Sequence, residues 1–195
     1  NSVIVATTAM LVATTAATLA ALALARGGRF RGAGPIYAVL ALPLMVPEIV
    51  TAVATLTFFT VIGLSQGLLN VIIAHAVFCI PFAFLPIRAR LQNMDPTIEQ
   101  AARDLYADEW RTLRHVTLPR LLPGILSGAM LAFIISLDDV IITMMVAPPG
   151  ANTLPLYVYG MVRMGITPEV NAISTLIFGV SVLMVTLSWL MGRRG

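Results

Sequence analysis

The sequence predicts an all-α protein, a polytopic bundle of membrane-spanning helices that forms one domain over residues 1–195. Hydrophobic residues make up 58% of the chain and charged residues only 11%, which is far more apolar than a soluble domain. The stretches 2–25 and 171–191 contain no charged side chain. Each is long enough to supply the roughly 20 residues that cross about 30 Å of hydrocarbon, so a bilayer is the expected solvent.

Apolar runs place the spans along the chain. Between Gly32 and Ile87 the only charged residue is Glu48, and the Gly-Leu-Ser-Gln-Gly stretch at 63–67 supplies the turn that divides this run into two spans. The sequence shows no soluble linker and no internal repeat. We expect five spans, at about 2–25, 35–62, 67–87, 125–147 and 171–191.

The placement of arginine predicts the orientation. All 12 basic residues are arginines, and all but Arg163 fall at the end of the first span, between the third and fourth spans, or at the C-terminus. Because short cytoplasmic loops collect basic residues, this side is expected to be cytoplasmic, with the C-terminus inside and Asn1 outside. An outside start without a basic leader predicts one further span upstream. The absence of lysine excludes a P-loop ATPase within this sequence.

The long polar segment at residues 88–124 carries six arginines and five acids. Asp95 followed by Pro96 is typical of a helix N-terminus. An apolar stripe at helical spacing follows, formed by Ile98, Ala101, Ala102 and Leu105. A second short helix is expected after a break near residues 106–108. Two interpretations are open: an amphipathic hairpin on the membrane surface, or a projection that docks into a partner subunit.

The spacing within this segment is similar to a known motif. Gln-Ala-Ala at 100–102, Tyr106 and Val-Thr-Leu-Pro at 116–119 resemble the EAA loop of ABC-importer permeases with the MetI-like fold, where Glu-Ala-Ala precedes Gly and Ile-x-Leu-Pro. The resemblance implies that the loop 95–119 docks into a cleft of an ATP-binding subunit and transmits its closure to the spans. Tyr106 stands at the Gly position and Gln100 at the Glu position, so the bend is expected to be built differently from one that uses glycine's positive φ. The residues implied in coupling are Glu99, Gln100, Ala101, Ala102, Asp104, Leu105, Tyr106 and Glu109.

Three acids lie deep in apolar spans: Glu48, Asp138 and Asp139. A charge at mid-bilayer costs about 2.5–3.5 kcal/mol even on lenient scales. Glu48 and Asp138 each lie about 14 residues from the cytoplasmic start of their span, which places both roughly 20 Å deep. With no basic residue at that depth, the acids require an external cation, or they are protonated and hydrogen-bonded to Ser136, Thr143 or backbone. A polyamine, with ammonium groups separated by methylene stems, would suit spaced carboxylates between apolar walls.

The final third of the chain carries a closer resemblance. The run Ser-Leu-Asp-Asp-Val-Ile-Ile-Thr at 136–143, with the segments 154–157, 161–163 and 168–172, closely resembles polyamine permeases that pair with a second permease. In that family the residues matching Glu48, Ser136, Asp138 and Asp139 are implicated in polyamine passage. His75 is interpreted separately, as a membrane histidine hydrogen-bonded across helices.

Together these features predict the permease subunit of an ATP-driven importer of spermidine or putrescine in the inner membrane, with no enzymatic activity and no metal or other cofactor. The expected partners are a dimer of ATP-binding subunits, a second related permease, an extracytoplasmic binding protein docking near 148–170, and the bilayer, but no nucleic acid. The alternatives are an importer of another solute, such as iron, thiamine or molybdate, and a proton-coupled carrier that uses Asp138, Asp139 and His75. A structural membrane protein would leave the deep acids unexplained.

Overall fold

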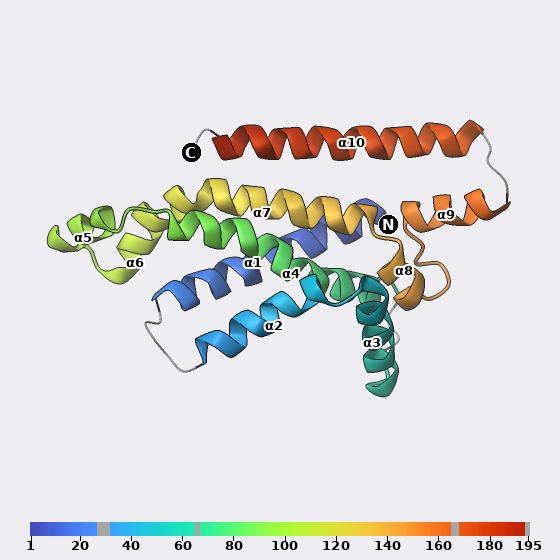
Figure 1. Cartoon of the computed structure of the whole chain (residues 1–195), viewed down its shortest axis with the longest axis horizontal. Coiled ribbons are helices and arrows are strands. Elements are labelled where there is room, and N and C mark those ends of the chain that lie inside the picture. Colours follow the sequence, from blue (N-terminus) through green and yellow to red (C-terminus); the bar gives the residue numbers. More distant parts are fainter. Residues whose placement is uncertain (27–31, 65–66, 165–167, 194–195) are drawn as a thin grey trace.

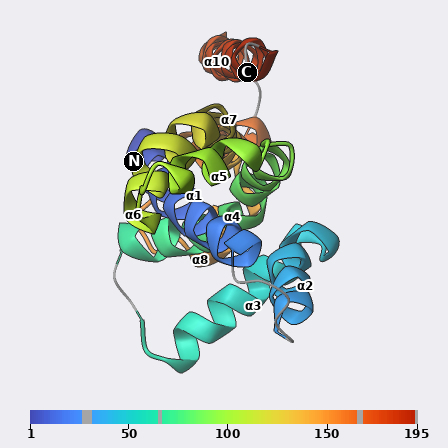
Figure 2. The same ribbon diagram turned by 90° about the vertical axis from the view of Figure 1, so that its left-hand side faces the viewer.

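The computed structural model describes residues 1–26, 32–64, 67–164 and 168–193, and over these it is helical, which confirms the predicted all-α class (Figure 1). Three long helices pack together at the centre: α1 (Ser2–Arg26), α4 (Leu68–Gln92) and α7 (Leu118–Asp138). The helix α10 (Pro168–Arg193) lies beside α7. Figure 2 shows α10 on one side of these central helices, with α2 (Ala33–Met45) and α3 (Glu48–Val61) on the opposite side.

Small residues let the central helices approach closely. On α1, alanines at four-residue spacing are buried: Ala9, Ala13, Ala17 and Ala21. On α7, Gly124, Gly128 and Ala132 continue the same pattern, and a Cβ atom added at Gly128 would lie only 2.6 Å from the carbonyl oxygen of Ala83 on α4. Close backbone contact through small side chains is the usual packing mode of membrane helices, because lipid removes the hydrophobic drive for association.

The predicted spans are confirmed in part. Within the described residues, three helices are long and apolar enough to cross a membrane: Ser2–Ala25, Leu68–Gln92 and Glu109–Asp138. The number becomes four if α2 and α3 count as one bent span, and the apolar part of α10, Asn171–Leu187, is shorter. The predicted number of five membrane spans is therefore approximate.

The second predicted span, 35–62, is apolar enough to cross a membrane but is broken into two helices. It consists of α2 and α3, and the helix axis bends by 111° between them. Val46 and Pro47 are both extended at the break, with ψ of 134°. Pro47 has no N–H group for a helical hydrogen bond and restricts the residue before it, so a helix ends here and another begins at Glu48.

The fourth predicted span, 125–147, is wrong in its extent. The helix α7 starts earlier and ends at Asp138, and Asp139 is extended, with ψ of 131°. A separate short helix, α8 (Ile141–Val146), follows. A further helix, α9 (Leu154–Met164), occupies the segment after it, where no helix was predicted.

The loop 95–119 contains two short helices, as predicted: α5 (Thr97–Asp104) and α6 (Glu109–Thr112). A π-helical turn at Leu113–Thr117 then leads directly into α7, so that helix is continuous from Glu109 to Asp138. The predicted cap is confirmed, because the Asp95 carboxylate accepts a hydrogen bond from the Thr97 amide at 2.9 Å. These helices lie at the opposite end of the molecule from α8 and α9 (Figure 1).

The bend after α5 corrects the expectation for Tyr106. This residue adopts φ of 60°, the left-handed conformation that glycine favours. The Tyr106 amide donates to the Arg103 carbonyl at 2.9 Å and the Ala107 amide to the Ala102 carbonyl at 3.0 Å. This is the Schellman arrangement, so the turn is built in the same way as with glycine.

The turn predicted at 63–67 lies partly outside the described residues, because these exclude Ser65 and Gln66. Three arginines of the predicted cytoplasmic side also lie outside them: Arg29, Arg31 and Arg194. At the two ends of this turn, Gly63 and Gly67 have φ of 69° and 62°, values that residues with a side chain rarely adopt. These two glycines are consistent with a tight turn between α3 and α4.

Candidate functional site

The two helix breaks bring the three deep acids together. Glu48 is the first residue of α3, after the Pro47 break, and Asp138 and Asp139 lie at the break between α7 and α8. Glu48, Asp138 and Asp139 all line one cavity. Residues 90 positions apart in sequence therefore form one acidic cluster, and it exists because both predicted spans are interrupted.

Asp139 is the buried member of this cluster, and its side chain is 2% exposed. Its Oδ1 atom accepts hydrogen bonds from the Thr143 amide at 3.0 Å and from the Thr143 hydroxyl at 3.3 Å. The Nε2 atom of His75 lies 3.3 Å from the same oxygen. Donors from α4 and α8 thus surround this carboxylate.

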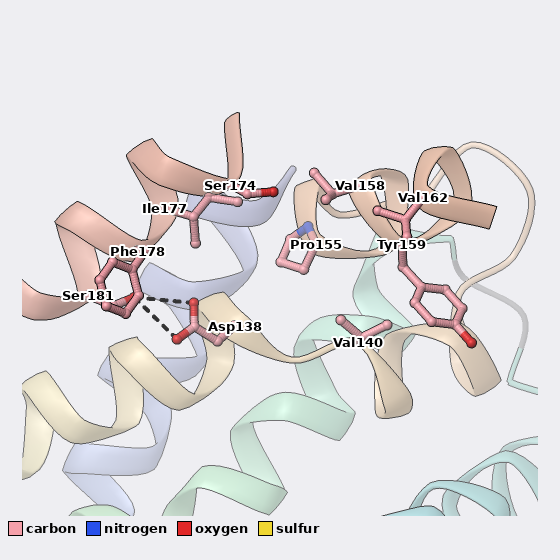
Figure 3. A pocket seen from close by; sticks show the side chains of 10 residues that line it. All are labelled: Asp138, Val140, Pro155, Val158, Tyr159, Val162, Ser174, Ile177, Phe178 and Ser181. Carbon is pink, nitrogen blue, oxygen red and sulfur yellow. Dashed lines mark hydrogen bonds between the residues drawn. The ribbon is translucent and has the colours of Figure 1, made fainter. Parts of the chain in front are cut away.

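Asp138 faces the other way and is exposed. The Ser181 hydroxyl of α10 donates to both of its carboxylate oxygens, at 3.2 and 3.3 Å (Figure 3). Asp138 lines two cavities at once. Asp138 is therefore the acid that lines both cavities.

The first cavity, of about 410 Å³, lies between the end of α7 and the helices α9 and α10. Its walls are mostly apolar and aromatic, and Figure 3 shows the Asp138 carboxylate near the side chains of Ser181 and Phe178. The lining side chains are Asp138, Val140, Pro155, Val158, Tyr159, Val162, Ser174, Ile177, Phe178 and Ser181.

The second cavity, of about 370 Å³, lies on the α3 and α4 side. It contains all three acids, and two aromatic rings of α4, Phe78 and Phe82, form its wall with their centroids 5.4 Å apart. Carboxylates set among apolar and aromatic surfaces can bind a cation that carries an apolar stem, because aromatic faces also attract positive charge.

The sequence pointed to the acids, to Ser136 and to His75, and the structure adds three further residues. Ser136 is buried and faces His75, whose Nδ1 atom lies 2.8 Å from its hydroxyl. Ser181, Phe78 and Phe82 were not singled out. Phe78 and Phe82 lie four residues apart on a predicted span, a spacing that puts them on one helix face, and this signal could have identified them.

The loop 95–119 presents an exposed apolar cap at the far end of the molecule. Leu105 is 81% exposed, Tyr106 95% and Trp110 66%. Of the other residues predicted for coupling, Gln100, Ala101, Asp104 and Glu109 are exposed and Ala102 is half-buried. Glu99 points inward instead, and its carboxylate accepts a hydrogen bond from the Thr117 hydroxyl at 2.5 Å. Large exposed apolar groups outside the bilayer mark interaction surfaces.

Apolar helices, acid-lined cavities at a pair of helix breaks and a projecting loop together define an integral-membrane transport component. Comparison with known proteins gives the family. Residues 5–193 match the binding-protein-dependent transport system inner membrane component, and the chain belongs to this family. It is thus a multi-pass transporter permease and not an enzyme.

The relatives are close over nearly the whole chain. It is 37% identical over 199 residues to the putrescine transport system permease protein PotI of Escherichia coli (strain K12), an alignment that covers 99% of this chain and 71% of that protein. It is 40% identical over 194 residues to the spermidine/putrescine transport system permease protein PotC of Haemophilus influenzae, covering 100% and 75%. An inward-facing structure of the MetNI methionine ABC transporter superposes with a TM-score of 0.78 at 20% identity, covering 99% of this chain and 92% of that chain, which shows a shared fold.

Proposed function

We propose that this chain is the permease subunit of an ATP-driven importer that carries spermidine or putrescine across the inner membrane. The observation that carries the proposal is the placement of Asp138 between two cavities with apolar and aromatic walls. The names of the relatives, which describe putrescine and spermidine/putrescine transport, support the same substrate class.

The geometry suits a flexible polycation. One ammonium group binds Asp138, and the methylene stem lies along the apolar wall formed in part by Phe178 and Val162. A second ammonium group binds Glu48, in the cavity on the other side of Asp138. Charge-assisted hydrogen bonds of this kind are about twice as strong as neutral ones, and the apolar walls exclude the water that would compete for them.

The energy comes from ATP hydrolysis on separate subunits that dock on the loop 95–119. The exposed cap formed by Leu105, Tyr106 and Trp110 supplies the apolar contact. The Glu99–Thr117 hydrogen bond joins α5 to the continuous helix that ends at Asp138, so movement of the docked loop is transmitted to the acid. In this proposal the loop and the C-terminus lie in the cytoplasm.

Two further partners complete the proposed importer. A related permease supplies the other half of the pore, and an extracytoplasmic binding protein delivers substrate to the segment 148–170. The position of α8 and α9 at the opposite end of the molecule from the loop supports this polarity (Figure 1).

Transport by the complete importer in lipid vesicles tests the proposal. Labelled spermidine and putrescine are supplied outside with the binding protein, and ATP is enclosed with the ATP-binding subunits. A charge-assisted hydrogen bond contributes about 1.5–3 kcal/mol. Asp138→Asn should therefore raise KM by roughly 10- to 150-fold, whereas Asp138→Glu, which keeps the charge, should retain most of the transport.

Three results would contradict the proposal. Uptake of both polyamines by Asp138→Asn at the wild-type KM would exclude the acid as the contact. Absence of polyamine uptake by the wild-type complex would exclude the substrate class. Uptake that needs no ATP and collapses with an uncoupler would instead establish a proton-coupled carrier.

A further inference from the structure

His75 lies on α4 at the junction of three helices, and it is only 1% exposed. Both of its ring nitrogens have partners. The Nδ1 atom lies 2.8 Å from the Ser136 hydroxyl of α7, and the Nε2 atom lies 2.9 Å from the Thr143 hydroxyl of α8. The Nε2 atom also lies 3.3 Å from Asp139 Oδ1. One side chain therefore connects α4 to both sides of the break between α7 and α8.

Asp139 uses its carboxylate to build that break. In addition to the bonds from Thr143, its Oδ2 atom accepts from the Ile142 amide at 3.5 Å. The Ile142 and Thr143 amides belong to the first turn of α8, where backbone N–H groups have no partner within the helix. The Asp139 carboxylate satisfies both from the residue before Val140, the N-cap of α8. Protein donors contact both oxygens of Asp139, so this carboxylate holds the start of α8 and contacts His75, although it also lines the second cavity.

The orientation of the Asp138 side chain follows from the hydrogen bonds that hold Asp139. Asp138 ends α7 in helical geometry and Asp139 is extended, so the two neighbouring side chains leave the backbone in different directions. Because Asp139 is held toward His75, Asp138 is directed toward Ser181 and the first cavity (Figure 3). If the hold on Asp139 is lost, the break between α7 and α8 is free to rotate and Asp138 loses its direction.

We propose that His75 is a positioning residue: by holding Asp139 and Ser136 it fixes the break between α7 and α8 so that Asp138 faces the cavities. Asp138 then contacts the substrate and Asp139 is structural, although the two acids are adjacent and identical in type. The inference rests on the proposed function only for the identity of the substrate. It concerns the orientation of a side chain, which can be measured without any substrate.

The single cysteine of the sequence makes this measurement possible. Cys79 is buried, and Cys79→Ala, together with partner subunits whose own cysteines are replaced, gives a background without reactive thiols. In the complete importer in lipid vesicles, Asp138→Cys then introduces one thiol at the mouth of the cavities. The rate of its reaction with a small, positively charged methanethiosulfonate reagent reports how accessible the position is.

In this background His75→Ala should lower the reaction rate by about tenfold or more, because the break is no longer held in one orientation. His75→Gln keeps one hydrogen-bond donor near Asp139 and should recover much of the rate. Asn70→Ala is the matched control, since Asn70 is also buried on α4 and its amide donates to the Leu64 carbonyl at 3.1 Å, away from Asp139. It should leave the reaction rate unchanged.

A second measurement decides the matter if His75→Ala does not give a folded complex. The 195 residues include two histidines, so His115→Gln leaves His75 as the only one among them, and ¹⁵N labelling is restricted to this chain. In ¹⁵N-labelled protein, Asp139→Asn should shift the Nε2 resonance of His75, because the hydrogen-bond partner of that atom changes. An unshifted resonance would overturn the proposal, as would an equal rate of thiol reaction in His75→Ala and in its parent.

Transport kinetics separate this inference from the proposed function. With Asp138 and Cys79 unchanged, His75→Ala should raise the KM for polyamine more than it lowers the maximal rate, and His75→Gln should recover the KM. Normal thiol and resonance results without polyamine transport would refute the substrate and leave the positioning role intact. A His75→Gln variant that positions Asp138 yet transports nothing would instead indicate a proton relay, and it would refute a purely positioning role.

Discussion

Gly128→Ala should separate α7 from α4 and weaken the site at the far end of their contact. The new Cβ atom would lie 2.6 Å from the Ala83 carbonyl oxygen, whereas ordinary contacts begin at 3.4 Å, so the helices must move apart by roughly 0.8 Å. A backbone carbonyl cannot move aside as a flexible side chain does. His75 and Ser136 lie eight residues further along these same helices, and their 2.8 Å hydrogen bond would lengthen to roughly 3.6 Å if the whole displacement reached it.

The expected energy combines two opposing effects. Overpacking of a close contact costs about 1–3 kcal/mol. Alanine is better than glycine in a helix interior by about 0.5–1 kcal/mol, which offsets part of this cost. The net free energy of unfolding should fall by about 1–2 kcal/mol, which for a chain of this size lowers Tm by about 2–8 °C.

Thermal unfolding of the purified chain in detergent micelles measures this change. The matched control is Gly179→Ala in α10, because a Cβ atom at Gly179 would have no heavy atom within 4 Å. It should leave Tm unchanged or raise it. The reasoning is refuted if Gly128→Ala is as stable as the wild type, or if the two variants lose stability equally. Transport at the wild-type KM by Gly128→Ala would show that the displacement does not reach His75.

Three further predictions concern the loop 95–119. Tyr106→Gly should stabilise the loop by about 1 kcal/mol, because glycine adopts the left-handed conformation without the steric cost of a Cβ atom. Amide exchange in the loop should become slower, while the affinity for the ATP-binding subunit should fall. An unchanged affinity would exclude the tyrosine ring as a docking contact. Thr117→Val should break the hydrogen bond to Glu99, so that ATP hydrolysis becomes poorly coupled to transport. The number of ATP molecules consumed per polyamine imported measures this coupling. An unchanged ratio would exclude the Glu99–Thr117 hydrogen bond as part of the coupling path. The amide and hydroxyl of Thr97 donate to Asp95 and hold the pKa of this carboxyl below its ordinary value of 3.8. Because the pKa is lowered on folding, the cap should stabilise α5 fully above that ordinary value and lose this effect as the pH falls through the folded-state pKa. Amide exchange of α5 against pH checks this, and Asp95→Asn should abolish the dependence.

Composition and periodicity predicted much of the fold. The charge-free run at α1 and the apolar run at α4 became long helices, and the amphipathic stripe beginning at Ile98 became α5. These elements were predictable because their signals are local: apolar length, helical spacing and a capping aspartate.

The errors came from the same reliance on apolar length. Pro47 divides one predicted span and Asp139 divides another, although both runs are apolar enough to cross a bilayer without a break. A proline or a capping side chain ends a helix through a few hydrogen bonds, which a hydropathy average does not register. Tyr106 shows the opposite case, where the hydrogen bonds of the turn impose a backbone conformation that the residue itself disfavours.

The sequence by itself predicted that this chain resides in a membrane and belongs to the transport permeases, and it located three acids within apolar runs. Only the tertiary structure decided which partners each acid has. Asp138 and Asp139 are adjacent and chemically the same, so no local pattern separates them. Their partners, Ser181 and His75, lie 43 and more than 60 positions away in the sequence. The contacts with these partners direct Asp138 toward the first cavity and Asp139 toward His75.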